Sequence, residues 1–152
     1  MLRDDINEAL KVAMKARDEA RVSTLRLVNS TLKNADIEAR GQGKPPLSDE
    51  DALGVLQKMI KQRHESAELY EKGGRADLVA QEREEIAIIE KYLPKQLTDQ
   101  EIHDTILALV KETGASAMKD MGRVMAALKE RYTGKLDFGK ASGAVKKILS
   151  GG

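Results

Sequence analysis

The feature that most constrains this chain is a proline placed between two strong helical signals. Residues 78–97 read LVAQEREEIAIIEKYLPKQL, and a helix over this stretch must stop before Pro94, which has no amide hydrogen and clashes with the preceding turn. Thr98 follows at once, with Glu101 three residues later, which is the pattern of a capping box that begins a new helix. One helix therefore ends and another begins within a few residues. We predict a border between two helical domains directly after the proline.

Composition and periodicity indicate the same fold class. Apolar residues make up 41% of the 152 residues, enough for a packed core, whereas aromatic residues make up 3% and tryptophan is absent. Such a core is built from Leu, Ile, Val, Ala and Met, which suit helices, and no alternation of period two persists that would indicate strands. We therefore predict an all-α fold. An N-terminal domain over residues 1–94 should hold about four helices, including an antiparallel hairpin, and residues 95–152 should form a small three-helix domain.

Glycine and proline divide the N-terminal domain into segments. Apolar residues at helical spacing predict helix over residues 2–20, continuing over residues 21–38. The segment GQGKPPLSDE is a loop, and Ser48 near its end is placed to cap a third helix. The Gly-Gly pair at 73–74 closes that helix, so residues 76–93 should fold back against it as a helical hairpin.

Charged side chains fall within the apolar faces of both hairpin helices. Arg63 lies near the middle of one face, and Glu82 lies in the middle of the other with Glu85 at its edge. Because a bare carboxylate is costly to bury, we predict an ionic and hydrogen-bonded cluster of Arg63 and Glu82 that can also include Glu85, Arg21 or Asn29. A polar core network that fixes helix register is the favoured interpretation, and a ligand or substrate site is the alternative.

The C-terminal domain carries an excess of positive charge. Residues 95–152 hold 10 Lys and Arg against 7 Asp and Glu, a net charge of +3, whereas residues 1–94 hold 16 against 18, a net charge of −2. Ser116 and Asp137 are placed to cap the second and third helices of this domain. Between them, a methionine-rich stripe is interpreted as core, with a flexible partner-binding groove as the alternative; it comprises Met118, Met121, Met125, Leu128 and Tyr132.

Basic residues of this domain have two open interpretations, a solvated helix face or contacts with the phosphates of RNA. The candidate contacts are Lys119, Arg123, Lys135, Lys140 and Lys147. Few aromatic residues are available to stack on bases, so recognition of the backbone and shape of folded RNA fits better than readout of single-stranded bases. We expect no binding to DNA.

Motifs for most catalytic chemistry are missing. The sequence shows no phosphate loop, no dinucleotide-binding glycine pattern and no Ser/His/Asp order. Zinc is not expected, because there is no cysteine and the two histidines, His64 and His103, lie far apart in sequence. The carboxylate-rich segment EREEIAIIE has no matching Glu-x-x-His partner, so we predict neither metal nor cofactor. No run of about 18 apolar residues indicates a membrane span, and the segment MLRDDINEAL does not look like a secretory signal, so a cytoplasmic location is expected.

Several short stretches, taken in order, resemble one known family along essentially the whole chain. They are Thr24 to Leu27 with Asn29, Lys61 to Ser66, Glu82 with Glu85 and Ile86, Tyr92 to Leu97, Met121 to Met125, and Gly134 to Asp137. This set is similar to the YqeY-like family, also called GatB/YqeY proteins. The resemblance implies an all-helical protein whose C-terminal domain looks like the tail of the B subunit of the glutamine-dependent tRNA amidotransferase, a tail that helps to hold tRNA.

The resemblance favours one function among three. We predict an RNA-binding accessory protein whose partner is tRNA or a component of the amidotransferase or of translation. Carbon–nitrogen ligase activity with glutamine as amido-N-donor is implied by the resemblance alone, since no catalytic motif is visible. The alternatives are a protein–protein interaction module that docks through Ile88 and the domain joint, and a ligand-binding or catalytic protein that uses Arg63 and Glu82.

Overall fold

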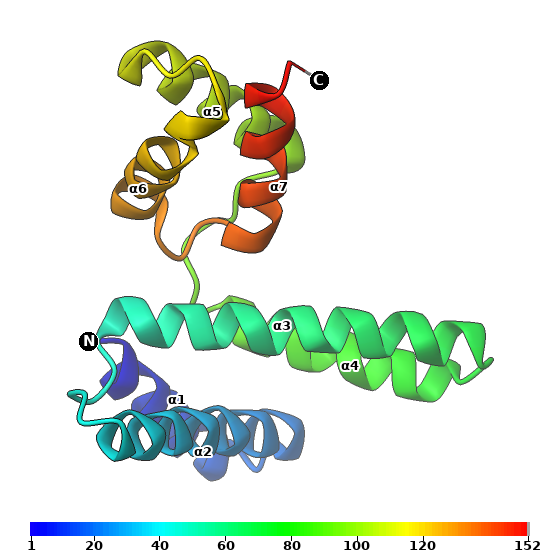
Figure 1. Cartoon of the computed structure of the whole chain (residues 1–152). Helices are drawn as coiled ribbons and strands as arrows, with labels where there is room; N and C mark the ends of the chain where they lie inside the picture. The colour runs from blue at the N-terminus through cyan, green and yellow to red at the C-terminus, as the bar shows by residue number, and fades with distance from the viewer. Residues whose placement is uncertain (152) are drawn as a thin grey trace. The chain divides into compact units, whose positions relative to one another are not determined.

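The computed structural model describes residues 1–151 and confirms the all-α prediction (Figure 1). No strand occurs within those residues. The chain divides into two compact units, Met1–Pro94 (unit 1) and Lys95–Gly152 (unit 2). The helices in chain order are α1 (Leu2–Ala16), α2 (Glu19–Gly41), α3 (Asp49–Lys72), α4 (Ala76–Glu90), α5 (Asp99–Thr113), the 3-10 turn η1 (Met118–Asp120), α6 (Met121–Tyr132) and α7 (Phe138–Leu149).

The first helix of unit 1 ends earlier than its apolar spacing predicts. Arg17 adopts a left-handed conformation (φ 56°) directly after Ala16, which turns the chain back. Asp18 then begins α2, and its carboxylate accepts a hydrogen bond from the Arg21 amide at 3.2 Å. Since an aspartate N-cap satisfies an otherwise unpaired amide, a turn at Arg17 and Asp18 interrupts the helix expected over residues 2–20, and residues 19 and 20 belong to α2.

The second hairpin of unit 1 is formed by α3 and α4, as predicted (Figure 1). Ser48 caps α3 in a capping box with Asp51. After α3, Gly74 takes a positive φ of 70°, a conformation that glycine adopts without a steric penalty, and α4 begins two residues later. Figure 1 shows the turn of this hairpin reaching beyond the α1–α2 pair.

Helix α4 buries two faces, because it packs against α3 and also against α2. Ile89 is fully buried, and Ile88 keeps only 7% of its surface exposed within the same core cluster. The hypothesis that Ile88 forms a docking face for another protein is therefore wrong, because Ile88 lies in the core of unit 1. The buried apolar residues of this cluster are Ile6, Leu25, Val28, Leu32, Ala52, Leu56, Met59, Ile88 and Ile89.

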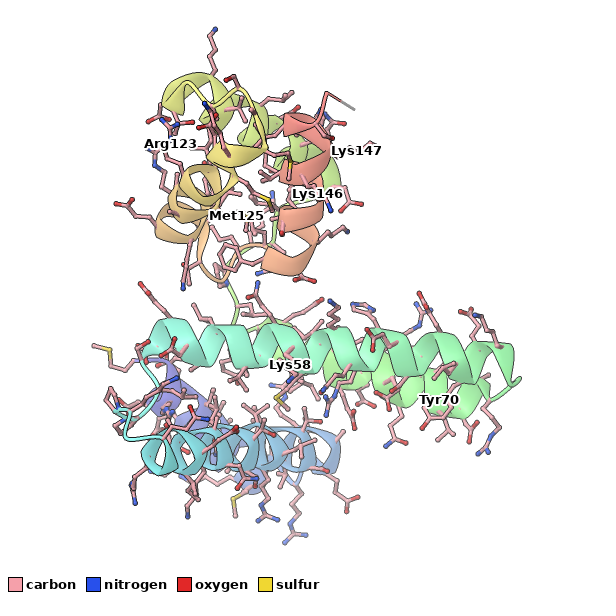
Figure 2. All side chains as sticks on the ribbon, viewed as in Figure 1. Lys58, Tyr70, Arg123, Met125, Lys146 and Lys147 are labelled. Carbon is pink, nitrogen blue, oxygen red and sulfur yellow. The ribbon has the colours of Figure 1, made fainter. Side chains whose placement is uncertain are left out.

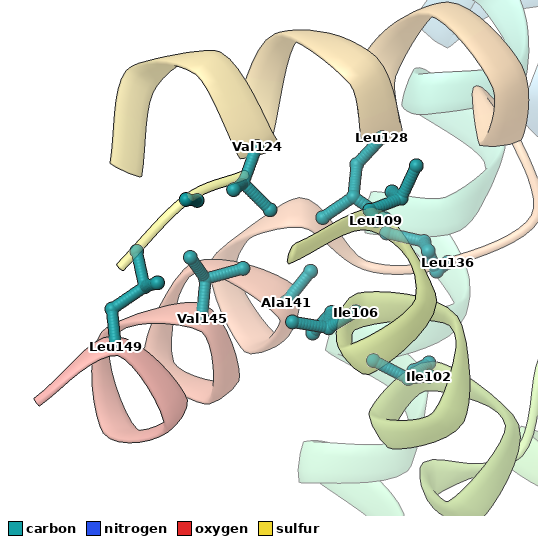
Figure 3. Packing of buried hydrophobic residues seen from close by; sticks show 10 residues of the cluster. Ile102, Ile106, Leu109, Val124, Leu128, Leu136, Ala141, Val145 and Leu149 are labelled. Atoms are coloured by element: carbon teal, nitrogen blue, oxygen red, sulfur yellow. The ribbon is translucent and has the colours of Figure 1, made fainter. Parts of the chain in front are cut away.

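Unit 2 folds α5, α6 and α7 around its own apolar core (Figure 3). Thr98 and Glu101 form the predicted capping box at the start of α5, and Asp137 caps α7 by accepting a hydrogen bond from the Gly139 amide at 2.9 Å. The Leu97 amide donates to the Lys135 carbonyl at 2.8 Å, which ties the first residues of the unit to the loop before α7. The core residues are Ile102, Ile106, Leu109, Ala115, Val124, Leu128, Leu136, Ala141, Val145 and Leu149.

Two expectations for α6 differ from the structure. Ser116 does not cap this helix; its amide instead donates to the Asp120 carboxylate at 2.9 Å, and a 3-10 turn precedes α6. Met121 and Met125 pack against the core, but Met118 lies in that 3-10 turn with 41% of its surface exposed. None of the helices within residues 1–151 combines the length and the apolar character that crossing a membrane requires.

Candidate functional site

The polar cluster of unit 1 is centred on a contact between the two hairpin helices. Arg63 on α3 donates from Nε to Glu85 Oε2 on α4 at 3.0 Å, and from a terminal nitrogen to the Met59 carbonyl at 3.1 Å. The side chains of Arg63 and Glu85 are only 12% and 22% exposed. The pair therefore lies largely out of water, where a lost partner costs more than it does on an open surface.

Glu82 completes this cluster through electrostatics. Burial raises the pKa of Glu82, the negative charge of Glu85 raises it further, and the positive charge of Arg63 opposes the rise. Arg63 thus bonds Glu85 directly and acts on Glu82 through its charge alone, so within residues 1–151 the predicted hydrogen bond between Arg63 and Glu82 is not formed. No group of three or more His, Cys, Asp or Glu side chains within residues 1–151 is arranged to hold a metal ion. This arrangement fits a network that sets helix register.

Arg21 and Asn29 make their contacts elsewhere in unit 1. Arg21 Nε lies 3.6 Å from Asp18 Oδ2, one turn earlier on the chain. Asn29 donates its side-chain amide to Asn7 Oδ1 at 3.0 Å, which links α2 to α1. These two contacts serve the start of α2 and the α1–α2 pair rather than the hairpin cluster.

Sequence reasoning missed a second ionic contact, between Arg3 on α1 and Asp36 on α2. The guanidinium of Arg3 bonds both carboxylate oxygens of Asp36, at 2.5 and 2.8 Å, and the Leu47 amide donates to the same carboxylate at 2.9 Å. These hydrogen bonds lower the pKa of Asp36 to about 2. Its signal in the sequence is that Asp36 shares a helix face with the buried Val28 and Leu32, where a charge needs a partner.

Arg123 and Lys140 of the predicted basic set are engaged within unit 2. Arg123 donates to Asp120 Oδ1 at 2.6 Å and to the Thr113 carbonyl at 3.0 Å, so it closes the connection between α5 and α6. The Ser116 and Ala117 amides, together with Arg123, lower the pKa of Asp120. Lys140 on α7 forms an ion pair with Asp99 at the start of α5.

The other three predicted contacts, Lys119, Lys135 and Lys147, are exposed. Within the part of the chain that the structure describes, their ammonium groups have no ion-pair partner. Lys95, Lys111, Lys129 and Lys146 share this property and were not predicted; Figure 2 labels Lys146 beside Lys147 on α7. Unit 2 therefore presents unneutralised positive charge on all of its helices and on the loop before α7.

Comparison with known proteins gives a consistent match over this whole fold. The family model described as "Yqey-like protein" matches residues 3–149. Three similar curated proteins carry the name "Altered inheritance of mitochondria protein 41, mitochondrial". The one from Vanderwaltozyma polyspora is 33% identical over 123 residues, covering 76% of this chain and 64% of the relative. The one from Lachancea thermotolerans is 42% identical over 90 residues, covering 59% and 46%. The one from Pyrenophora tritici-repentis is 30% identical over 127 residues, covering 80% and 68%. The chain thus spans about half to two thirds of the length of these relatives.

Proposed function

The chain belongs to the YqeY-like protein family, and on that premise we propose that it is an RNA-binding accessory protein that holds tRNA through the basic residues of unit 2. The observation that carries this proposal is the set of exposed ammonium groups of Lys119, Lys135 and Lys147, which lack ion-pair partners within residues 1–151. Each is available to a phosphate without first breaking an internal contact. The resemblance of this unit to the tail of the tRNA amidotransferase B subunit favours tRNA as the ligand.

Ion pairs between lysines and RNA phosphates would supply most of the affinity. The small number of aromatic side chains limits recognition of unpaired bases by stacking. Both aromatic residues of unit 2, Tyr132 and Phe138, are partly buried against the apolar core, which limits the ring surface that could stack on bases. The proposed ligand is therefore a folded RNA recognised through its backbone and shape. The proposed role is accessory to the amidotransferase or to translation, and it assigns no amide transfer to this chain alone.

Salt dependence provides the test. The 152-residue chain is titrated against purified tRNA by fluorescence anisotropy. If three lysines each neutralise one phosphate, raising the salt from about 50 to about 200 mM should weaken binding about 20- to 40-fold. Lys119→Gln with Lys147→Gln should reduce both the affinity and its salt slope.

The matched control is Lys58→Gln on α3, an equally exposed lysine of unit 1 that Figure 2 labels. It removes one positive charge from the other unit and should leave binding unchanged, whereas Lys119→Gln or Lys147→Gln alone should weaken it. Absence of tRNA binding at low salt, or binding that the unit 2 substitutions do not affect, would contradict the proposed function.

Location in the cell belongs to the same proposal. The names of these relatives assign those proteins to mitochondria. We propose a cytoplasmic location for this chain, which fractionation of the cells that produce it would test by following the chain with an antibody. Recovery of the chain in a membrane-enclosed compartment would contradict it.

A further inference from the structure

Two helical glycines of unit 2, Gly122 near the start of α6 and Gly143 in the middle of α7, have open space where a Cβ atom would lie. Gly143 lies in the middle of α7, where glycine destabilises a helix relative to alanine. A Cβ atom added there would meet nothing within 4 Å. Gly139 differs, because its Cβ would lie 3.3 Å from Asp137 Oδ1 in the N-cap. The missing methyl group of Gly143 therefore leaves the helix backbone open toward solvent.

Positive charge surrounds this opening. Lys140, Lys146 and Lys147 lie three residues before and three and four residues after Gly143, so they neighbour it on the helix surface. Lys140 is held by Asp99, whereas Lys146 and Lys147 are exposed and have no ion-pair partner within residues 1–151. No acidic residue occurs in α7. The opposite side of the helix is occupied by core residues (Figure 3).

The ordinary structural explanation covers only part of this pattern. Lysines in the last turn of a helix interact favourably with the helix dipole, which accounts for Lys146 and Lys147 as stabilising residues. That effect does not account for a helix-weakening glycine one turn earlier. A glycine is expected where a ligand must approach the backbone closely.

We propose that this face of α7, formed by Gly143 with Lys146 and Lys147, is where the sugar–phosphate backbone of a double-helical segment of RNA lies directly against the protein. This inference rests on the proposed function and narrows it to one helix face and one class of RNA structure. The glycine lets a phosphate ridge approach the helix, and the lysines neutralise phosphates on its flanks. Double-helical RNA is the ligand because recognition there proceeds through shape, phosphates and 2′-hydroxyls, and both aromatic side chains of unit 2 are partly buried, which limits stacking on unpaired bases.

A substitution that strengthens the helix separates this proposal from a loss of folding. Gly143→Ala should raise the melting temperature, or leave it unchanged, and at the same time weaken binding of an RNA hairpin at least threefold. Gly143→Leu should weaken it at least tenfold. The matched control is Gly54→Ala in α3, where an added Cβ also meets nothing within 4 Å; it should leave RNA affinity unchanged.

The probes are a fully paired RNA hairpin and oligouridylate of the same length, each titrated with the 152-residue chain, and polyglutamate serves as a competitor that mimics an acidic protein. Weaker hairpin binding by the Gly143 variants, together with poor competition by polyglutamate, supports the proposal. Unchanged hairpin binding by Gly143→Leu overturns it while leaving the proposed function intact. If the Gly143 variants bind the hairpin and oligouridylate with equally reduced affinity, the assignment to double-helical RNA is overturned. It is also overturned if polyglutamate displaces the hairpin as effectively as RNA does. If the wild-type chain binds neither RNA, both the inference and the proposed function fail.

Discussion

Removing Arg63 tests whether the polar cluster holds the α3–α4 hairpin together. The outer part of this hairpin contains few buried apolar residues: Ala67 and Ile86 lie beyond the residues that join the main core of unit 1. The ion pair between Arg63 and Glu85 therefore lies where little other burial stabilises the contact between the helices. Arg63→Met keeps much of the apolar stem and removes the charge and the hydrogen bonds to Glu85 and the Met59 carbonyl.

The expected magnitude follows from the exposure of the two side chains. Breaking a fully buried pair costs about 3–5 kcal/mol, and an exposed pair contributes about 0.2–1 kcal/mol. With 12% and 22% of the side chains exposed, Arg63→Met should destabilise the hairpin by about 2 kcal/mol, which is about a 30-fold change in its opening equilibrium. Arg63→Met combined with Glu85→Leu should recover at least half of that loss, because the largely buried Glu85 carboxylate that lost its cation is then removed as well.

Hydrogen exchange measured by mass spectrometry on the 152-residue chain reads this opening locally, in peptides from α3 and α4. The control is Arg75→Met, which removes an exposed ion pair with Asp77 in the same hairpin (side chains 58% and 66% exposed) and should not change exchange measurably. The register interpretation is refuted if Arg63→Met exchanges like the wild type, or if the double variant is as unstable as the two single variants added together.

Three further predictions concern single polar groups. Because hydrogen bonds to Arg3 lower the pKa of Asp36 from 3.8 to about 2, this carboxylate should stabilise unit 1 above pH 3.8 and progressively less as the pH falls toward 2; the stability difference between wild type and Asp36→Asn, measured by urea unfolding across this range, should shrink accordingly, and a constant difference would contradict the pairing. Burial raises the pKa of Glu82 above 4.5, so the wild type should lose stability relative to Glu82→Gln as the pH rises through the raised value; equal pH profiles of the two proteins would count against its burial. Thr98→Ala removes the α5 cap and should destabilise that helix by about 1 kcal/mol, seen as faster amide exchange in α5; unchanged exchange would show that the cap contributes nothing.

Local signals were reliable because their partners lie within a few residues. The side chains of three N-cap residues accept hydrogen bonds from amides two or three residues later: Thr98 from Glu101, Ser48 from Asp51 and Asp137 from Gly139. Each cap can therefore be predicted from the sequence. The exceptions show the limit of this reading. Arg17 adopts a left-handed conformation although it is not a glycine. Ser116 was expected to cap α6, but its amide donates to Asp120 and a 3-10 turn precedes the helix.

Long-range contacts were harder to predict, because periodicity gives the face of a helix and not the neighbour that meets it. The Gly-Gly turn fixes an antiparallel hairpin, so Arg63 could be placed against the face that holds Glu82 and Glu85, but the prediction paired it with Glu82 and the structure pairs it with Glu85. Arg3 and Asp36 are 33 positions apart, and nothing in the pattern joins them. Likewise, nothing in the sequence pattern indicates that Ile88 lies in the core of unit 1 with only 7% of its surface exposed.

By itself, the sequence determined the fold class, most helix ends and the hairpin turn, because these depend on backbone hydrogen bonds and steric restrictions inside short segments. Only the tertiary structure decided which charges are neutralised: Arg123 and Lys140 are engaged, while Lys146 and Lys147 face solvent beside an open glycine. The physical reason is that an ion pair requires two groups within about 4 Å, and that proximity is set by the packing of whole helices.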